Sequence, residues 1–261
     1  MHLPWPFSNR RREIVEQHFP AEWLAFLENN VKHYTLLTAE EQERVRGDLR
    51  IIMAEKNWEG AQGFTITDEV KVTVSGLAAL LTVGFERHDY FPDVETIIVY
   101  PYSYVAESVD SLYGGVVEQS QQARLGEAHG RGPIILSWSD ILDGGQDATD
   151  GHNLVFHEFA HKLDFRDGSA NGVPFLRDDA ALEEWARVMS AEYEQLVHDV
   201  QHHGHTILRE YGATNAAEFF AVCTECFFDK SVSMRAQKPA LYSVLAAYYG
   251  VDWAKRIGRM K

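Results

Sequence analysis

Residues 153–165 read NLVFHEFAHKLDF and place two histidines, His157 and His161, four positions apart. On an α-helix, residues with this spacing lie on one face about one turn apart, so both imidazoles can reach one metal ion. Glu158 follows the first histidine and would lie beside the ion, where a carboxylate can take a proton from a bound water. Most of the surrounding residues are apolar, which predicts a buried helix that holds the histidines rigidly. The stretch therefore predicts a catalytic zinc site.

A catalytic zinc ion needs three protein ligands and one open position, so a third ligand must come from elsewhere. Glu218 lies in an apolar, phenylalanine-rich stretch, where a carboxylate is unfavourable unless it is paired or binds a metal. Glu225, seven residues later, would face the same way and competes with it; alternatively, both mark a solvated stripe of the helix. Asp164 lies on the histidine face but more than a turn beyond His157, so we expect it to cap the helix or to orient His161.

Two other patterns contain residue types that bind metals, but both favour structural roles. The segment HDVQHHGH is histidine-rich, and such runs usually form exposed helix ends; its histidines are His198, His202, His203 and His205. Cys223 and Cys226 form a single C-x-x-C, whereas structural zinc sites generally use two such pairs and redox folds place the motif beside a βαβ pattern. We expect both cysteines to pack as small hydrophobic residues on their helix.

The bulk composition indicates a well-packed protein that does not bind nucleic acid directly. The chain has 261 residues, 45% of them hydrophobic, which is enough for a substantial core. Its net charge of −15 argues against nucleic acid, because phosphate binding needs a positive face. Its longest apolar run, GLAALLTVGF (76–85), is too short to span a membrane, and no signal peptide or disulfide framework is evident. We therefore expect a cytoplasmic protein with no membrane contact.

The first part of the chain, about residues 1–90, reads mainly as helices. Thr38 followed by Glu41 is a capping-box pattern at a helix start, and Gly60 reads as the stop of the same helix. A second helix is expected to begin near Thr67, although the β-branched residues that follow weaken its helical propensity.

The middle of the chain, about residues 91–142, reads as a small sheet. Residues 94–105 (VETIIVYPYSYV) and 132–142 (GPIILSWSDIL) are rich in β-branched and aromatic residues, which favour strands. An acidic, glycine-containing loop then leads into the histidine helix, and amphipathic helices follow. The absence of βαβ alternation predicts one α+β domain over residues 1–261, with helices around a small mixed or antiparallel sheet and the zinc-site helices over about 151–261.

Several segments together resemble the Mlc titration factor A (MtfA) family of bacterial zinc metallopeptidases. The segments are NLVFHEFAHKLDFRDGSANGVP, EYGATNAAEFFAVCTECFF, ETIIVYPYSYV and GEAHGRGPIILSW. The resemblance extends from about Thr38 to about Phe228, and it is specific because H-E-F-A-H-K-L-D, N-G-V-P and the downstream glutamate helix occur in this order. It implies a zincin-like metallopeptidase fold, related to the catalytic domain of anthrax lethal factor.

The resemblance also implies a role for each matching position. His157 and His161 match the two zinc histidines of the family. Glu158 matches its catalytic glutamate, and Glu218 its third zinc ligand. Tyr211, seven residues before Glu218, matches its active-site tyrosine. These matches imply one Zn²⁺ ion per chain and an aminopeptidase-type activity on peptide substrates.

Family members are also known for binding the glucose-responsive repressor Mlc, which links them to the sugar phosphotransferase system. The resemblance therefore implies a peptidase that also binds an Mlc-type transcriptional repressor and modulates expression of that system. The alternative is mainly a regulatory binding protein that sequesters a transcription factor, with vestigial or secondary peptidase activity. The sequence supplies a residue for every catalytic role of a peptidase. This favours an active enzyme, because a binding module needs neither Glu158 nor Tyr211.

Overall fold

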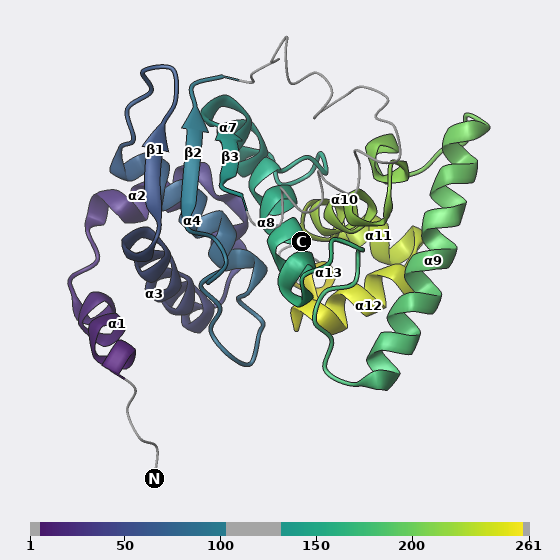
Figure 1. The fold of residues 1–261 in the computed structure, drawn as a ribbon, viewed down its shortest axis with the longest axis horizontal. Coiled ribbons are helices and arrows are strands. Elements are labelled where there is room, and N and C mark those ends of the chain that lie inside the picture. Colours follow the sequence, from purple (N-terminus) through teal and green to yellow (C-terminus); the bar gives the residue numbers. More distant parts are fainter. Residues whose placement is uncertain (1–5, 103–131, 258–261) are drawn as a thin grey trace.

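The computed structural model describes residues 6–102 and 132–257 and consists of helices packed around a small sheet (Figure 1). Its first elements are α1 (Pro6–Glu16), α2 (Ala21–Asn30), the 3-10 helix η1 (Lys32–Leu36), α3 (Ala39–Glu55), β1 (Asn57–Gly60), α4 (Asp68–Leu81) and β2 (Thr96–Tyr100). Then follow β3 (Ile134–Ser137), α7 (Trp138–Gln146), α8 (Leu154–Asp164), η2 (Phe165–Asp167), α9 (Asp179–Gln201), η3 (Glu210–Ala213), α10 (Ala216–Asp229), α11 (Ser231–Gln237), α12 (Pro239–Tyr249) and α13 (Trp253–Ile257). This is the α+β architecture that the sequence predicts.

The sheet has three strands in the order β1-β2-β3, and both pairings are parallel. This corrects the expectation of a mixed or antiparallel sheet without βαβ alternation. Between β1 and β2, the helix α4 crosses over and brings the chain back in the same direction, which makes these two strands parallel. β2 begins and ends inside the strand expected over residues 94–105. The last residues of that expected strand lie outside the described part of the chain.

Two boundaries differ from those expected. The helix that begins after Thr38 ends at Glu55, and the residues up to Gly60 pair with β2 instead of extending the helix. The strand expected over 132–142 is divided at Ser137, whose hydroxyl accepts a hydrogen bond from the backbone N–H of Asp140 at 3.2 Å and starts α7. A helix cap inside an apolar run therefore ends the strand early.

Both predicted helix starts are confirmed by their caps. The hydroxyl of Thr38 accepts from the backbone N–H of Glu41 at 3.3 Å, and the backbone N–H of Thr38 donates to the Glu41 carboxylate at 2.9 Å. This reciprocal pair is the capping box. Thr67 caps α4 by accepting from the backbone N–H of Val70 at 3.3 Å. Cys223 and Cys226 are buried free cysteines on α10, as expected.

α8 lies between the N-terminal helices and sheet on one side and the C-terminal helices on the other (Figure 1). It packs against α4, α10 and β3. Five of its apolar side chains have no exposed surface: Val155, Phe156, Phe159, Ala160 and Leu163. Burying a large apolar side chain contributes about 1.5–3 kcal/mol, so this helix is firmly held and its polar residues are held with it. None of the helices in the two described stretches combines the length and hydropathy that a membrane span requires.

Candidate metal centre

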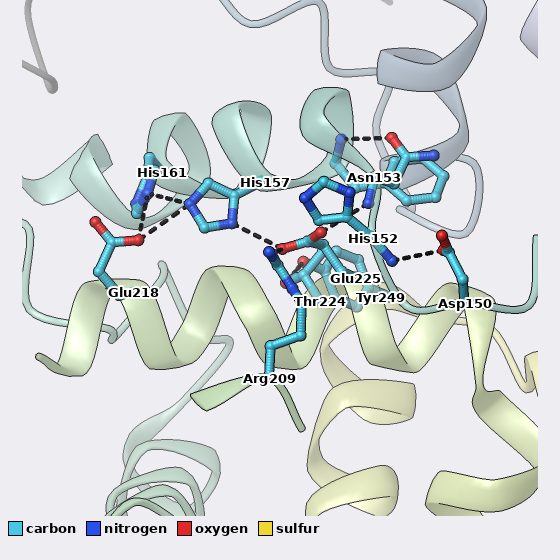
Figure 2. A network of polar contacts seen from close by, with 11 residues as sticks. Asp150, His152, Asn153, His157, His161, Arg209, Glu218, Thr224, Glu225 and Tyr249 are labelled. Atoms are coloured by element: carbon cyan, nitrogen blue, oxygen red, sulfur yellow. Dashed lines mark hydrogen bonds and ion pairs between the residues drawn. The ribbon is translucent and has the colours of Figure 1, made fainter. Parts of the chain in front are cut away.

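Three side chains from α8 and α10 converge on one point (Figure 2). The Nε2 atoms of His157 and His161 lie 3.2 Å apart. One carboxylate oxygen of Glu218, Oε2, lies 3.0 Å from the first of these nitrogens and 3.4 Å from the second. Within the described part of the chain, these three residues are the one group of at least three metal-ligating side chains close enough to hold an ion.

The spacing and chemistry of these atoms fit a tetrahedral metal ion. Histidine nitrogens and carboxylate oxygens bind zinc at about 2.0–2.2 Å, which places neighbouring tetrahedral ligand atoms about 3.3–3.6 Å apart. Of the three observed distances, 3.4 Å lies within this range, and 3.0 and 3.2 Å lie slightly below it. A carboxylate oxygen and two imidazole nitrogens that each present a lone pair repel one another, so their convergence is unfavourable unless a metal ion or a proton lies between them. The residues present therefore fit a divalent metal ion.

Side-chain caps at the starts of two helices place the converging residues. Asn153 begins α8: its side-chain oxygen accepts from the backbone N–H of Phe156 at 3.1 Å, and its amide donates to the Gly144 carbonyl at 3.0 Å. Asn215 begins α10 by accepting from the backbone N–H of Glu218 at 2.9 Å. Glu218 therefore lies in the first turn of its helix, where the helix dipole favours a carboxylate.

Burial and hydrogen bonds shift the pKa values of His157 and Glu218 when no metal ion is bound. Burial alone would lower the pKa of His157, but its hydrogen bonds to Glu218 and Glu225 raise that pKa to about 10. Burial would raise the pKa of Glu218, but its bonds to His157 and His161 hold that pKa well below the usual range of a glutamate. A proton thus compensates the converging acceptors. Because a metal ligand must be deprotonated, a metal ion bound by these residues would displace that proton.

Glu225 lies on the other side of His157 and takes neither of the two roles considered for it. Its side chain has no exposed surface, so it is not part of a solvated stripe. It contacts the Nδ1 atom of His157 at 2.8 Å, which is the ring nitrogen that faces away from Glu218 (Figure 2). It also accepts hydrogen bonds from the backbone N–H of Asn153 at 2.7 Å and from the guanidinium of Arg209. Glu225 is therefore a partner of a candidate ligand and is not itself at the point of convergence.

The remaining candidates lie apart from the converging atoms. Asp164 is buried at the end of α8, and one of its oxygens accepts from the backbone N–H of Gly172 at 2.9 Å. Burial raises the pKa of Asp164 to about 6. This contact holds the loop after α8 and is not a helix cap. The rings of His198 and His202 stack 4.1 Å apart at the exposed end of α9.

The two residues expected to be catalytic border the cluster. Glu158 is only 7% exposed and is close enough for its charge to contribute to the raised pKa of His157. Tyr211 is half-buried on η3, with its ring centroid 5.9 Å from that of the His157 imidazole. The structure therefore brings all five predicted site residues into one region.

Two residues that contact Glu225 beside the cluster, Asn153 and Arg209, were not predicted from the sequence. Asn153 occupies a helix N-cap, and an asparagine directly before an apolar helix is a signal that could have been used. Arg209 carries no comparable local signal, because its partner Glu225 lies 16 residues away on a different element. Only the folded chain brings this arginine to the carboxylate.

Comparison with known proteins gives a consistent result. The family model described as glucose-regulated metallo-peptidase M90 matches residues 6–250. A protein of Serratia proteamaculans (strain 568) named Mlc titration factor A is 33% identical over 265 residues, which cover 99% of this chain and 95% of that protein. A Synechocystis sp. protein named uncharacterized protein slr2042 is 34% identical over 244 residues, which cover 93% of this chain and 88% of that protein. The chain therefore belongs to the family of glucose-regulated metallo-peptidases M90.

Proposed function

We propose that this protein is a zinc-dependent peptidase of the aminopeptidase type, with one Zn²⁺ held by His157, His161 and Glu218. The observation that carries the proposal is the convergence of their three ligand atoms at 3.0–3.4 Å. Two imidazoles and one carboxylate are a ligand set that zinc peptidases use. When bound, the ion lowers the pKa of a water molecule and polarises the peptide carbonyl.

Glu158 is the proposed proton carrier of the reaction. It takes the proton of the attacking water and later delivers it to the nitrogen of the departing amine. Its place directly after His157 on α8 supports this role, because the helix that carries both histidine ligands also fixes this carboxylate beside them. Its burial, with 7% of the residue exposed, keeps bulk water from competing for the proton.

Tyr211 is the proposed donor to the carbonyl oxygen of the substrate. Negative charge grows on that oxygen when water attacks, and a phenol hydroxyl aimed at it stabilises the charge. The position of the Tyr211 ring beside that of His157 supports this role.

We place the peptide substrate along the edge of β3 that does not pair with β2. β3 is one of the two outer strands of the sheet within the described residues, and an extended peptide can add to such an edge through backbone hydrogen bonds. β3 packs against α8, and the ammonium of Lys162 on α8 donates to the carbonyl of Gly132, just before the strand, at 2.9 Å. This contact supports a fixed distance between the strand edge and the ligand helix.

An Mlc-type transcriptional repressor is the proposed macromolecular partner, through which the protein modulates expression of the sugar phosphotransferase system in the cytoplasm. The name Mlc titration factor A, borne by relatives in Serratia proteamaculans and Salmonella agona (strain SL483), supports this part of the proposal. The net charge of −15 suits docking to a basic patch on a partner. These names also support the alternative function, a regulatory binding protein with secondary peptidase activity.

The substitution Glu158→Gln tests the proposal, with the exposed Glu183→Gln on α9 as a matched control. Zinc content, hydrolysis of amino-acid anilides and binding of an Mlc-type repressor are measured for each protein. We expect Glu158→Gln to lower kcat about 10²- to 10⁴-fold, with zinc content and repressor binding unchanged. Undiminished hydrolysis would refute the mechanism. A wild-type protein that binds the repressor but cleaves no anilide would favour the alternative function.

A further inference from the structure

Glu225 is a buried carboxylate with three polar partners. Its side chain is completely buried, and removing a charged carboxylate from water is unfavourable unless donors compensate it. The donors come from three different places: the backbone at the start of α8 (Asn153), the candidate ligand His157, and Arg209 directly before η3 (Figure 2). One side chain therefore joins the two helices of the candidate metal centre to the segment that carries Tyr211.

We infer that Glu225 is a positioning residue that sets the metal-binding orientation of His157 and, through Arg209, the position of Tyr211. The inference rests on the proposed function, because the ligand role of His157 is itself proposed.

The first part of the inference follows from the chemistry of imidazole. A neutral imidazole carries a proton on one ring nitrogen and a lone pair on the other. When His157 donates from Nδ1 to Glu225 at 2.8 Å, the lone pair is on Nε2, which faces His161 and Glu218. A carboxylate on the far side of a ligand histidine also fixes the ring plane and increases the basicity of the coordinating nitrogen.

The second part follows from how the two carboxylate oxygens are shared. Oε1 accepts from both His157 and Arg209, whereas Oε2 accepts from the backbone N–H of Asn153. Arg209 is the residue before η3 and lies two positions before Tyr211. A shift of the Glu225 carboxylate would therefore displace the His157 ring and the Tyr211 segment together.

A glutamine at position 225 has the size of the glutamate but cannot make the same contacts. Its amide has one acceptor oxygen, so its NH₂ group must face either the backbone N–H of Asn153 or the shared position of His157 and Arg209. In the first arrangement, the NH₂ group and the backbone N–H of Asn153, both donors, face each other at the start of α8. In the second arrangement, the NH₂ group faces the Arg209 guanidinium, so two donors oppose each other there. It also favours the His157 tautomer that carries its proton on Nε2, and a protonated Nε2 cannot bind a metal.

The test compares metal-free wild type, Glu225→Gln and Arg209→Gln with a matched control, Glu41→Gln. Glu41 is also held by an arginine, Arg256, but this pair joins α3 to α13 outside the candidate site. Each protein is titrated with Co²⁺, whose visible spectrum reports ligand geometry, and with Zn²⁺ in competition with a chelator. Circular dichroism establishes that each variant folds, and kcat and KM are measured on an amino-acid anilide.

We expect Glu225→Gln to bind Zn²⁺ about 10- to 100-fold more weakly and to change the Co²⁺ spectrum. Arg209→Gln should keep its metal affinity within about threefold but lower kcat at least about tenfold at unchanged KM, because only the donor to the reacting oxygen is displaced. Glu41→Gln should keep the wild-type affinity and spectrum.

Wild-type affinity and spectrum in a folded Glu225→Gln would overturn the inference and leave the proposed function intact. If that variant does not fold, an unchanged kcat in Arg209→Gln overturns the inference. Failure of the wild-type protein itself to bind Zn²⁺ or Co²⁺ would instead refute the proposed function, so the two failures are distinguishable.

Discussion

His157 lies between two carboxylates, with Glu218 3.0 Å from Nε2 and Glu225 2.8 Å from Nδ1. Helical spacing alone predicted that His157 and His161 share a face, because this depends only on the geometry of one helix. Spacing could not separate the roles of the two glutamates. Both lie on α10 one heptad apart, and the side of the imidazole that each contacts depends on how two helices pack.

At this scale, Tyr211→Phe tests the role of the phenol hydroxyl. We expect kcat for an amino-acid anilide to fall about 10²- to 10³-fold, as for the loss of one donor to a developing oxyanion, while zinc content stays the same. Tyr90→Phe is the control, because Tyr90 stacks on His88 in a different part of the molecule. A kcat equal to that of wild type would remove Tyr211 from the mechanism.

At the scale of elements, the cap of α10 has a consequence for the candidate site. Asn215 accepts from the backbone N–H of Glu218, so the residue that starts the helix also fixes the backbone of a candidate ligand. Asp178 caps α9 in the same way, accepting from the backbone N–H of Ala181 at 2.9 Å, but no candidate ligand lies on α9 near this cap. The two caps therefore form a matched pair.

Replacing each cap by alanine should separate helix stability from metal binding. We expect Asn215→Ala to lower the free energy of unfolding by about 1 kcal/mol in urea denaturation, and Asp178→Ala to lower it as well. Only Asn215→Ala should also weaken zinc binding, because the first turn of α10 loses its fixed start. Equal zinc affinities in the two variants would show that this cap does not position Glu218.

Helix starts were predictable because caps are local, whereas the first strand was not. Thr38 and Thr67 cap their helices through backbone groups three residues away, so a short window of sequence contains the whole signal. β1 has the sequence NWEG, with little β-propensity, and it forms because β2 pairs with it from the other end of a crossover helix. The same crossover makes β1 and β2 parallel, a feature that such short strands do not reveal.

At the scale of the whole molecule, an ion pair joins segments from near the two ends of the described chain. Arg256 in α13 contacts the carboxylate of Glu41 in α3, across 215 residues of sequence. The hydrogen bond from Arg256 lowers the pKa of Glu41 from 4.5 to about 2. A folded-state pKa below the unfolded one means that the pair stabilises fully above about pH 4.5, and that this contribution is lost as the pH falls toward 2.

The pH dependence of unfolding tests this contact. We expect the free energy of unfolding of the wild type to decrease between about pH 5 and pH 3 more steeply than that of Glu41→Gln, which has no carboxylate to titrate there. Urea denaturation at each pH measures both slopes. Parallel slopes for the two proteins would mean that Arg256 does not hold the Glu41 carboxylate in solution.

The candidate metal centre is also a product of the whole fold. His157 and Glu218 are 61 residues apart in sequence, and they meet because α8 and α10 pack against each other. The apolar surroundings of Glu218 indicated that this carboxylate has a buried partner, but the partner's identity depends on the assembled chain.

The most direct test of zinc binding is calorimetric titration of the metal-free protein with Zn²⁺, for wild type and Glu218→Ala. We predict one tightly bound ion per wild-type chain and at least about 100-fold weaker binding by Glu218→Ala, because one of three protein ligands is lost. Undiminished affinity in Glu218→Ala would contradict this ligand set and make Asp164 or a further histidine the third ligand.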